Sequence, residues 1–206
     1  AKFVARLLGL VQDVKNGVLI VGANEGSISI AKYLEKHNIS NTLVDLSKEN
    51  IRQAKAANLN VIEKNILSDD DDDLEYNDEG HLLALTSSND VNIFACRKLK
   101  SIFGESNVYR LMTVNEIKLN ALSKPQNILF SNSFDYIELI ELVRKYPQVE
   151  DIKITSSDHF ESLIKSNKDS YLPIMLRRND SVKFITIDFK YQFVEGDVLA
   201  YIGELK

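Results

Sequence analysis

Short apolar runs alternate with amphipathic stretches over the first half of the chain. Residues 18–21 are fully apolar, which is typical of a strand at the centre of a parallel sheet. Apolar residues at helical spacing follow in residues 27–36 and recur in residues 91–103. Further strands are predicted at residues 42–45, 61–62, 81–85 and 108–112, with a helix from the N-cap Ser47 to Ala57. This alternation predicts an α/β fold with a Rossmann-like, doubly wound parallel sheet.

The pattern changes after Pro125. Strands become short and are separated by turn residues, such as Asn179 and Asp180 in a predicted hairpin. The predicted strands are 127–130, 149–155, 174–177, 182–186 and 198–202, and the predicted helices are 134–145 and 159–166. This order favours a small C-terminal α+β module. We therefore divide the chain into a connector helix (residues 1–16), a Rossmann-like domain (17–123) and the α+β module (124–206).

The composition is that of an ordinary globular protein: 206 residues, 44% hydrophobic and 27% charged. A formal net charge of -5 argues against nucleic acid as a partner. The single cysteine, Cys96, excludes an internal disulfide and fits a reducing cytoplasm, and its helical surroundings predict a buried, inert thiol. No apolar run reaches the roughly 18 residues of a membrane-spanning helix, and no secretory signal is visible.

The chain starts at Ala1 without a Met, in a segment whose apolar residues share one helical face. Residues 3–12 therefore predict either an ordinary packing helix or the end of a connector from a preceding domain. This start indicates a fragment of a longer protein, although removal of Met before Ala gives the same start.

The most informative segment follows the first apolar strand, where residues 22–27 read GANEGS. A glycine turn between a strand and a helix is typical of a nucleotide-binding βαβ unit, because the unpaired N–H groups at the helix start favour an anion. The full fingerprint is G-x-G-x-x-G. Here Asn24 replaces the second glycine and Ser27 the third, while Gly26 comes one position early. A Rossmann scaffold without a working ligand site is the alternative.

Asp45 ends the second predicted strand, 23 residues after Gly22, near the offset at which an acid reaches a ribose hydroxyl. It would accept hydroxyl hydrogen bonds and repel a 2′-phosphate, and no Arg or Lys follows it immediately, so NADP is disfavoured. A helix-capping role is the alternative for Asp45. The small polar residues 86–90 follow the fourth strand. They either line the ligand crevice that forms at the carboxyl ends of the strands in an open α/β sheet or cap a helix, and the two roles are compatible.

Other candidate groups have ordinary structural interpretations. Arg110 lies inside the fifth strand and is expected to be exposed or salt-bridged. The alternative is that it binds phosphate or contacts a second subunit. The aspartates 69–73 lack the interleaved glycine and terminal glutamate of a calcium loop, so we expect a solvated acidic loop. His37, His81 and His159 are expected at surface or capping positions. The chain has no nucleophile elbow, HExxH, Walker A loop or CxxC pair, so we expect no enzyme; a small NAD-dependent oxidoreductase is the alternative.

The first half of the chain resembles the RCK (regulator of conductance of potassium) or TrkA-N type of domain. The resemblance rests on VLIVGANEGS (18–27), LVDLS (43–47), VIEKNIL (61–67) and LALTSSNDVN (83–92). The closing segment 171–205, with its turn EGDVL, resembles the TrkA-C type of β module. More narrowly, GANEGSISIAKYL and HLLALTSSNDVNIFAC are similar to the cytoplasmic tail domains of bacterial Na+/H+ (monovalent cation:proton) antiporters.

The resemblance implies regulation of ion transport rather than catalysis. Such domains form homodimers and bind an adenine nucleotide (NAD(H), AMP, ADP or ATP), and the bound form changes the dimer geometry and so biases a transporter. In the antiporters the domain follows a membrane transporter core of the same polypeptide, at the cytoplasmic face of the bacterial inner membrane. The helix at residues 3–12 would then descend from the last transmembrane segment.

The resemblance also implies site residues by motif position. The phosphate loop would comprise Gly22, Ala23, Asn24, Glu25 and Ser27. The ribose would bind at Asp45 and the following Leu46, the adenine beside Asn65 and Ile66, and the phosphates over Thr86, Ser87 and Asn89. The departure at Asn24 favours a mononucleotide.

The dimer patch should be apolar and self-complementary under two-fold symmetry. Residues 91–103 and 111–122 are the candidates, although their apolar residues could equally cover the sheet. A dimerisation scaffold with a vestigial nucleotide site is therefore a further alternative.

Overall fold

The computed structural model describes residues 16–68, 78–112, 116, 127–130, 134–165, 170–179 and 181–205. The predicted connector helix, the aspartate run 69–73 and most of the candidate dimer segment 111–122 lie outside these residues. In the part that is described, the chain forms a parallel sheet with helices, followed by a smaller antiparallel sheet. The predicted fold class is confirmed.

The parallel sheet has five strands in the order β3-β2-β1-β4-β5, and every neighbouring pair is parallel. Its strands are β1 (Gly17–Val21), β2 (Asn41–Asp45), β3 (Val61–Glu63), β4 (Glu79–Ala84) and β5 (Val108–Arg110). Alternate β1 residues face opposite sides: Val18 and Ile20 join one core cluster, and Leu19 and Val21 join another. Both faces are therefore covered, as a parallel sheet requires.

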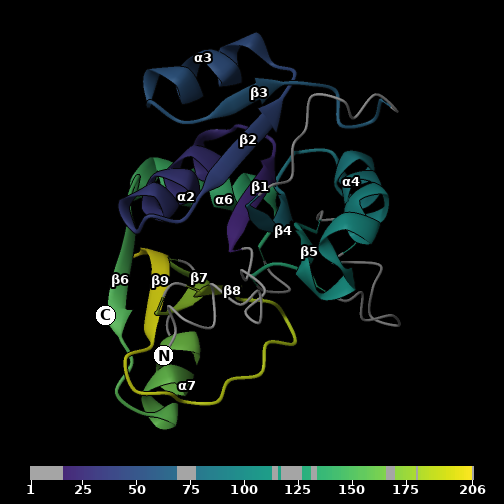
Figure 1. Ribbon diagram of the computed structural model, residues 1–206. Coiled ribbons are helices and arrows are strands. Elements are labelled where there is room, and N and C mark those ends of the chain that lie inside the picture. Colours follow the sequence, from purple (N-terminus) through teal and green to yellow (C-terminus); the bar gives the residue numbers. More distant parts are fainter. Residues whose placement is uncertain are drawn as a thin grey trace, which may run out of the picture.

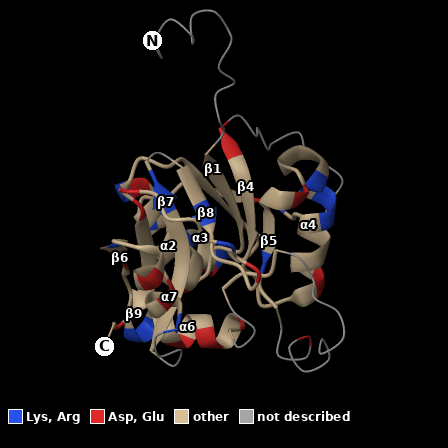
Figure 2. Ribbon diagram, turned by 90° about the horizontal axis from the view of Figure 1, so that it is seen from below, with Lys and Arg blue, Asp and Glu red and all other residues tan. Residues whose placement is uncertain are grey.

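Helices α2 (Glu25–Lys36) and α3 (Lys48–Ala56) cover one face of this sheet, and α4 (Asn89–Phe103) covers the other (Figure 1). Each begins at a polar cap: the side chains of Asn24, Ser47 and Ser88 accept hydrogen bonds from N–H groups three residues later. Because Asn24 is the cap, α2 begins at Glu25, two residues earlier than predicted. Charged residues lie on the outer side of α4 (Figure 2).

The antiparallel sheet has four strands in the order β6-β9-β7-β8. Its strands are β6 (Val149–Lys153), β7 (Tyr171–Arg178), β8 (Ser181–Phe184) and β9 (Val198–Gly203). The predicted hairpin is confirmed, since β7 and β8 pair from Met175–Phe184 to Arg178–Ser181. Helix α7 (Ser157–Lys165) packs on the outer face of this antiparallel sheet through Phe160 and Leu163. Helix α6 (Tyr136–Lys145) instead packs on α2.

Several strand predictions need correction. The predicted strands 108–112, 149–155 and 182–186 end two residues earlier, at Arg110, Lys153 and Phe184. No strand forms at 127–130, where the structure has only bridges at Ile128 and Leu129. The reason is local: Asn127 and Phe130 have φ angles of 57° and 71°, which interrupt extended backbone at both ends. A short 3₁₀ turn, η1 (Glu105–Asn107), precedes β5.

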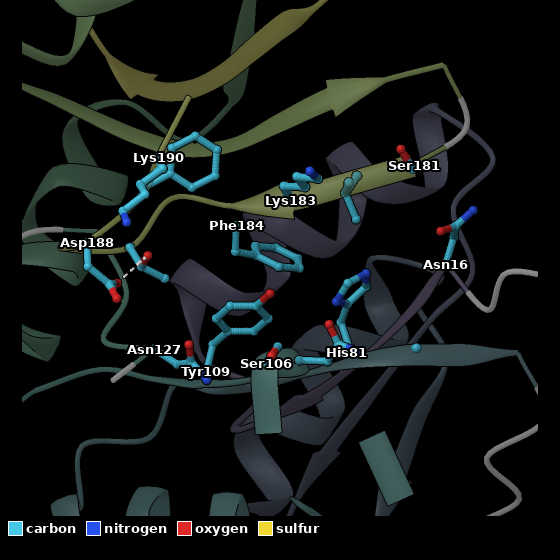
Figure 3. A pocket seen from close by; sticks show the side chains of 15 residues that line it. Asn16, His81, Ser106, Tyr109, Asn127, Ser181, Lys183, Phe184, Asp188 and Lys190 are labelled. Atoms are coloured by element: carbon cyan, nitrogen blue, oxygen red, sulfur yellow. Dashed lines mark hydrogen bonds between the residues drawn. The ribbon is translucent and has the colours of Figure 1, made fainter. Parts of the chain in front are cut away.

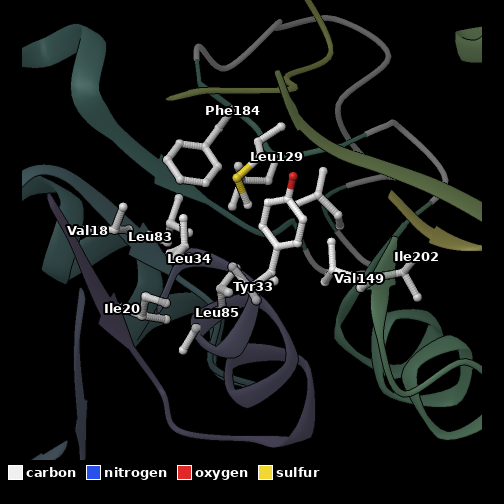
Figure 4. Close-up of a cluster of buried hydrophobic side chains, with 14 of the residues drawn as sticks. Val18, Ile20, Tyr33, Leu34, Leu83, Leu85, Leu129, Val149, Phe184 and Ile202 are labelled. Carbon is white, nitrogen blue, oxygen red and sulfur yellow. The ribbon is translucent and has the colours of Figure 1, made fainter. Parts of the chain in front are cut away.

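The segment 127–130 joins the two sheets. Ile128 bridges Arg110 of β5 in parallel, and Leu129 bridges Thr186 in antiparallel fashion. The largest core cluster is continuous across this junction, since Leu129, Phe184 and Ile202 pack with residues of β1 and α2 (Figure 4). The predicted boundary at residue 124 stays a prediction, but the two modules share one core. Among the described helices, none is long and apolar enough to cross a membrane.

Candidate functional site

The carboxyl ends of β1, β2 and β4 meet at one edge of the parallel sheet, and the predicted site residues follow these ends. We call this edge the crevice; it comprises residues 22–27, 45–46 and 86–89. Gly22 has a φ of +98°, and a Cβ there would lie 3.1 Å from Thr86 Cγ2. A left-handed backbone and a close approach of the β4 loop both require glycine at this position.

Asp45 is the centre of the crevice, and its carboxylate accepts four hydrogen bonds from the protein. Oδ2 accepts from the Ala23 N–H at 2.6 Å and from Asn50 Nδ2 at 2.9 Å. Oδ1 accepts from the N–H groups of Leu46 and Ser47, at 2.7 and 2.9 Å. A carboxylate offers about four lone-pair sites. Asp45 therefore ties the glycine loop to the residues at the start of α3, while the cap of that helix is Ser47, whose hydroxyl accepts from the Asn50 N–H.

Asn24 holds the loop from the other side. Its Oδ1 caps α2 by accepting from the Ser27 N–H at 3.1 Å, and its Nδ2 donates to the Leu85 carbonyl at 2.6 Å. Asn24 is buried and its side chain fills both roles, which glycine could not. The Ser27 hydroxyl is fully buried and has no hydrogen-bond partner among the described residues.

Helix α6 packs directly against the first turn of α2. A Cβ on Gly26 would lie 3.0 Å from Cγ and Cδ2 of Leu139, so the glycine found one position early permits the approach of α6. Arg144 Nε donates to Glu25 Oε2 at 2.8 Å. Burial raises the pKa of Tyr136, and the carboxylates of Glu25 and Asp45 raise it further. The C-terminal module therefore borders the crevice.

The remaining predicted residues lie at the same edge but differ in their contacts. Thr86 is bonded to Asn92 through Oγ1 at 2.7 Å, and Asn89 Oδ1 accepts from Arg110 Nη1 at 3.1 Å. Ser87 and Leu46 are exposed. Ile66 is buried in the core beneath α4, and Asn65 is exposed, with its side chain accepting from the Leu67 N–H. No hydrogen bond joins Asn65 or Ile66 to the other predicted site residues in the described part of the chain.

Sequence reasoning missed the groups that tertiary contacts bring to the crevice. Asn50, Tyr136, Leu139 and Arg144 have no motif that places them there. Lys64 also follows β3, and its buried Nζ has no hydrogen-bond partner among the described residues. A sequence signal exists only for the start of α6, where Asp135 and Glu138 form a capping box.

The other candidate groups have structural roles. Arg110 is salt-bridged, as predicted, through a bidentate pair with Glu116 at 2.8 and 2.9 Å. Cys96 lies in α4 and is partly buried, and burial raises the pKa of its thiol to about 11, which fits an inert thiol. The described residues contain no group of His, Cys, Asp and Glu that could hold a metal ion.

A comparison with protein families gives one match. The family model described as the TrkA-N domain matches residues 18–122. No curated protein matches the chain. Among solved structures, the NAD(P)-binding domain of an exopolyphosphatase-related protein from Archaeoglobus fulgidus is 15% identical, with a TM-score of 0.42, over 55% of this chain and 86% of that chain. The GsuK RCK domain is 12% identical, with a TM-score of 0.41; the match covers 98% of this chain and 49% of that chain.

Proposed function

Because the chain belongs to the TrkA-N domain family, we propose that it is a nucleotide-sensing regulatory domain that controls the transport of a monovalent cation. The ligand is an adenine nucleotide bound in the crevice. One observation carries this proposal: Asp45 Oδ2 lies 2.6 Å from the Ala23 N, beside the start of α2. A carboxylate next to a helix N-terminus can hold the ribose while the helix start faces the phosphate.

Binding requires the ribose to compete with existing contacts. The donors from Asn50 and from the Ser47 N–H are the replaceable ones, because Asn50 is a side chain and Ser47 lies on the exposed rim. The Glu25 carboxylate in the first turn of α2 would repel a phosphate, and Arg144 offsets that charge at 2.8 Å. The nucleotide phosphate would therefore meet Arg144 from α6, which links occupancy of the crevice to the C-terminal module.

A regulatory role fits the positions of the three histidines better than a catalytic one. His37 Nε2 lies 3.4 Å from Asp151, and His159 contacts Thr155 at the start of α7. His81 is near the amino end of β4, at the opposite edge of the sheet from the crevice. None of them is placed to exchange a proton with a substrate bound beside Asp45. Turnover of NAD+ with a panel of alcohols would instead favour the oxidoreductase alternative.

The proposed transporter is a Na+/H+ antiporter of the inner membrane, with the membrane portion upstream in the same polypeptide. The support is the similarity of residues 22–34 and 81–96 to the tail domains of such antiporters. Ligand binding would act by favouring one of two geometries of a homodimer. Helix α4 offers a surface for this dimer, because Phe94 and Ile102 share one helical face and are 40% and 48% exposed.

The nucleotide site is tested with Asp45→Asn. A thermal-shift panel of AMP, ADP, ATP, NAD+ and NADH first selects the ligand, and calorimetry then measures its affinity. We expect Asp45→Asn to weaken binding more than about tenfold, because hydrogen bonds to a charged group contribute roughly 1.5–3 kcal/mol. Asn50→Ala is the control, since it removes a donor to Asp45 without removing the carboxylate. Binding that is unchanged in Asp45→Asn, or absent with every nucleotide, would contradict the proposal.

The dimer is tested by sedimentation of Phe94→Asp and Ile102→Asp. A charge on an apolar symmetric interface is repeated in both subunits, so each variant should be monomeric. Val194→Asp is the matched control, because Val194 is 41% exposed and belongs to the C-terminal module. A wild-type monomer, or a dimer that tolerates both α4 variants, would show that α4 is not the interface.

A further inference from the structure

A cavity lies at the opposite edge of the parallel sheet from the crevice. This cavity of about 610 Å³ opens between the amino ends of β4 and β5 and the edge strand β8 (Figure 3). Small-molecule sites commonly have volumes of about 300–1,000 Å³. The crevice lies at the carboxyl ends of the same parallel strands, so the two sites are separate. We call this cavity the junction pocket, because one wall comes from each sheet.

Three aromatic rings form the apolar wall of the junction pocket. Phe184 of β8 has its ring centroid 5.3 Å from that of Tyr109 and 5.7 Å from that of His81, and His81 and Tyr109 are 6.2 Å apart. Tyr109 and Phe184 are buried in the shared core, which fixes their orientation. The rings pack on one another, and the parts that border the cavity can make aromatic contacts with a planar, unsaturated guest.

The charged groups of the pocket are Lys183, Lys190 and Asp188. Asp188 Oδ1 accepts from the Thr186 hydroxyl at 2.9 Å. Neither lysine has a hydrogen bond or ion pair with any described residue, whereas Lys48, Lys100 and Lys165 each pair with a glutamate. Lys183 lies above the aromatic rings, and Lys190 lies at the end with Asp188 (Figure 3). The pocket therefore holds excess positive charge beside its aromatic wall.

His81 adds an unsatisfied polar atom. Its Nδ1 is inaccessible to solvent and has no hydrogen-bond partner in the described part of the chain. Burial lowers the pKa of His81 to about 4, so the imidazole is neutral at physiological pH. A neutral imidazole has one donor and one acceptor nitrogen. A buried group of this kind costs stability unless a partner pairs with it.

We propose that the junction pocket binds a small anionic ligand with a planar unsaturated ring. The ring would lie against Tyr109, Phe184 and His81, and the anionic group would pair with Lys183. Such a ligand would contact β4 and β5 on one side and β8 on the other. It would therefore stabilise the packing of the two modules, independently of any nucleotide in the crevice.

The probes are 2-naphthoate and the uncharged 2-naphthamide, which have similar shapes and differ in charge. Affinities are measured by titration of the ¹⁵N-labelled protein, which also locates the bound probe. We expect 2-naphthoate to bind at least fivefold more tightly than the amide, with shifts at β8 and at the start of β5. Lys183→Gln should remove this preference, and Lys55→Gln on α3 should leave it intact.

Three results would overturn the proposal. The first is equal binding of the two probes. The second is no binding of 2-naphthoate up to about 10 mM, which corresponds to a negligible affinity. The third is that the residues whose chemical shifts change surround Asp45. Nucleotide affinity measured in Lys183→Gln separates this site from the crevice. The variant should bind nucleotide like the wild type, so a failure of the nucleotide proposal leaves the junction pocket testable.

Discussion

The two edges of the parallel sheet differ in how their polar groups are satisfied. At the carboxyl edge, all the oxygen lone pairs of Asp45 accept hydrogen bonds from protein donors, and Asn24 bonds at both ends of its amide. At the amino edge, His81 Nδ1 has no partner among the described residues, and Lys183 and Lys190 have no ion pair there. The motif residues Asp45 and Asn24 thus already serve the fold, although Ser27 Oγ and Lys64 Nζ at the same edge have no partner among the described residues.

The motif residues Asp45 and Asn24 stabilise the protein through atoms at the site where the nucleotide is proposed to bind. The crevice is pre-organised, so a nucleotide would replace a few existing bonds there. The junction pocket has no sequence motif, yet an anionic ligand would pair with lysines that have no ion pair among the described residues. Substitutions at satisfied and at unsatisfied groups should therefore differ in their effects.

The largest effect is expected at a second satisfied carboxylate, Asp197 in the C-terminal module. Asp197 is fully buried and forms a bidentate pair with Arg178, with both distances at 2.7 Å. Arg178→Met leaves this charge without its main partner and should lower the free energy of unfolding by about 3 kcal/mol, measured by urea denaturation. The neighbouring Arg177→Met should cost under about 1 kcal/mol, because its contact with Asp151 is long and partly exposed. Equal effects would show that burial does not decide the cost.

A smaller effect on the free energy of unfolding is expected at Gly26. Its substitution tests the packing of α6 at the carboxyl edge separately from ligand binding. Gly26→Ala places a Cβ 3.0 Å from Leu139 and should cost about 1–3 kcal/mol by overpacking. In the background of Leu139→Ala, the same substitution should cost much less, because the two sites are in contact. Additive free energies in this double-mutant cycle would mean that Gly26 does not set the approach of α6.

The smallest effect is expected at the unsatisfied edge. The pKa of His81 is about 4 in the folded protein and 6.5 as its ordinary value, so the unfolded chain binds the proton first. The stability linked to His81 is therefore complete above pH 6.5 and is lost as the pH falls towards 4. Relative to the wild type, His81→Phe should gain about 1 kcal/mol between about pH 7.5 and about pH 5.5. A difference between the two proteins that is independent of pH would contradict the burial of a neutral His81.

Much of the fold followed from local patterns. The apolar run at residues 18–21, the caps Ser47 and Ser88, and the hairpin at residues 179–180 led to elements that the structure contains. The predicted and observed element boundaries differ where a side chain caps a helix earlier than the pattern indicates, as at Asn24. They also differ where positive φ angles interrupt a strand, as at Asn127 and Phe130. The hydrophobic pattern does not determine these boundaries, because they depend on polar caps and backbone angles at single residues.

The arrangement of the candidate site could be predicted only in part from the sequence. Placing Asp45 beside the glycine loop needed only the rule that parallel strands align their carboxyl ends, and the 2.6 Å contact with Ala23 agrees with it. The contact of α6 with Gly26 joins residues more than one hundred positions apart, and no spacing rule covers it. The junction pocket likewise depends on how β8 packs against β4 and β5.

The sequence by itself determined the parallel sheet, the glycine turn and the acid at the end of β2, because strand periodicity, helix caps and turn chemistry act over a few neighbouring residues. Only the tertiary structure decided which polar groups are satisfied. Through the packing of one module on the other, Arg144 reaches Glu25, and His81 Nδ1 is buried without a hydrogen-bond partner among the residues that the structure describes. Hydrogen-bond satisfaction depends on atoms that meet in space, and a buried core shared by the two modules brings those atoms together.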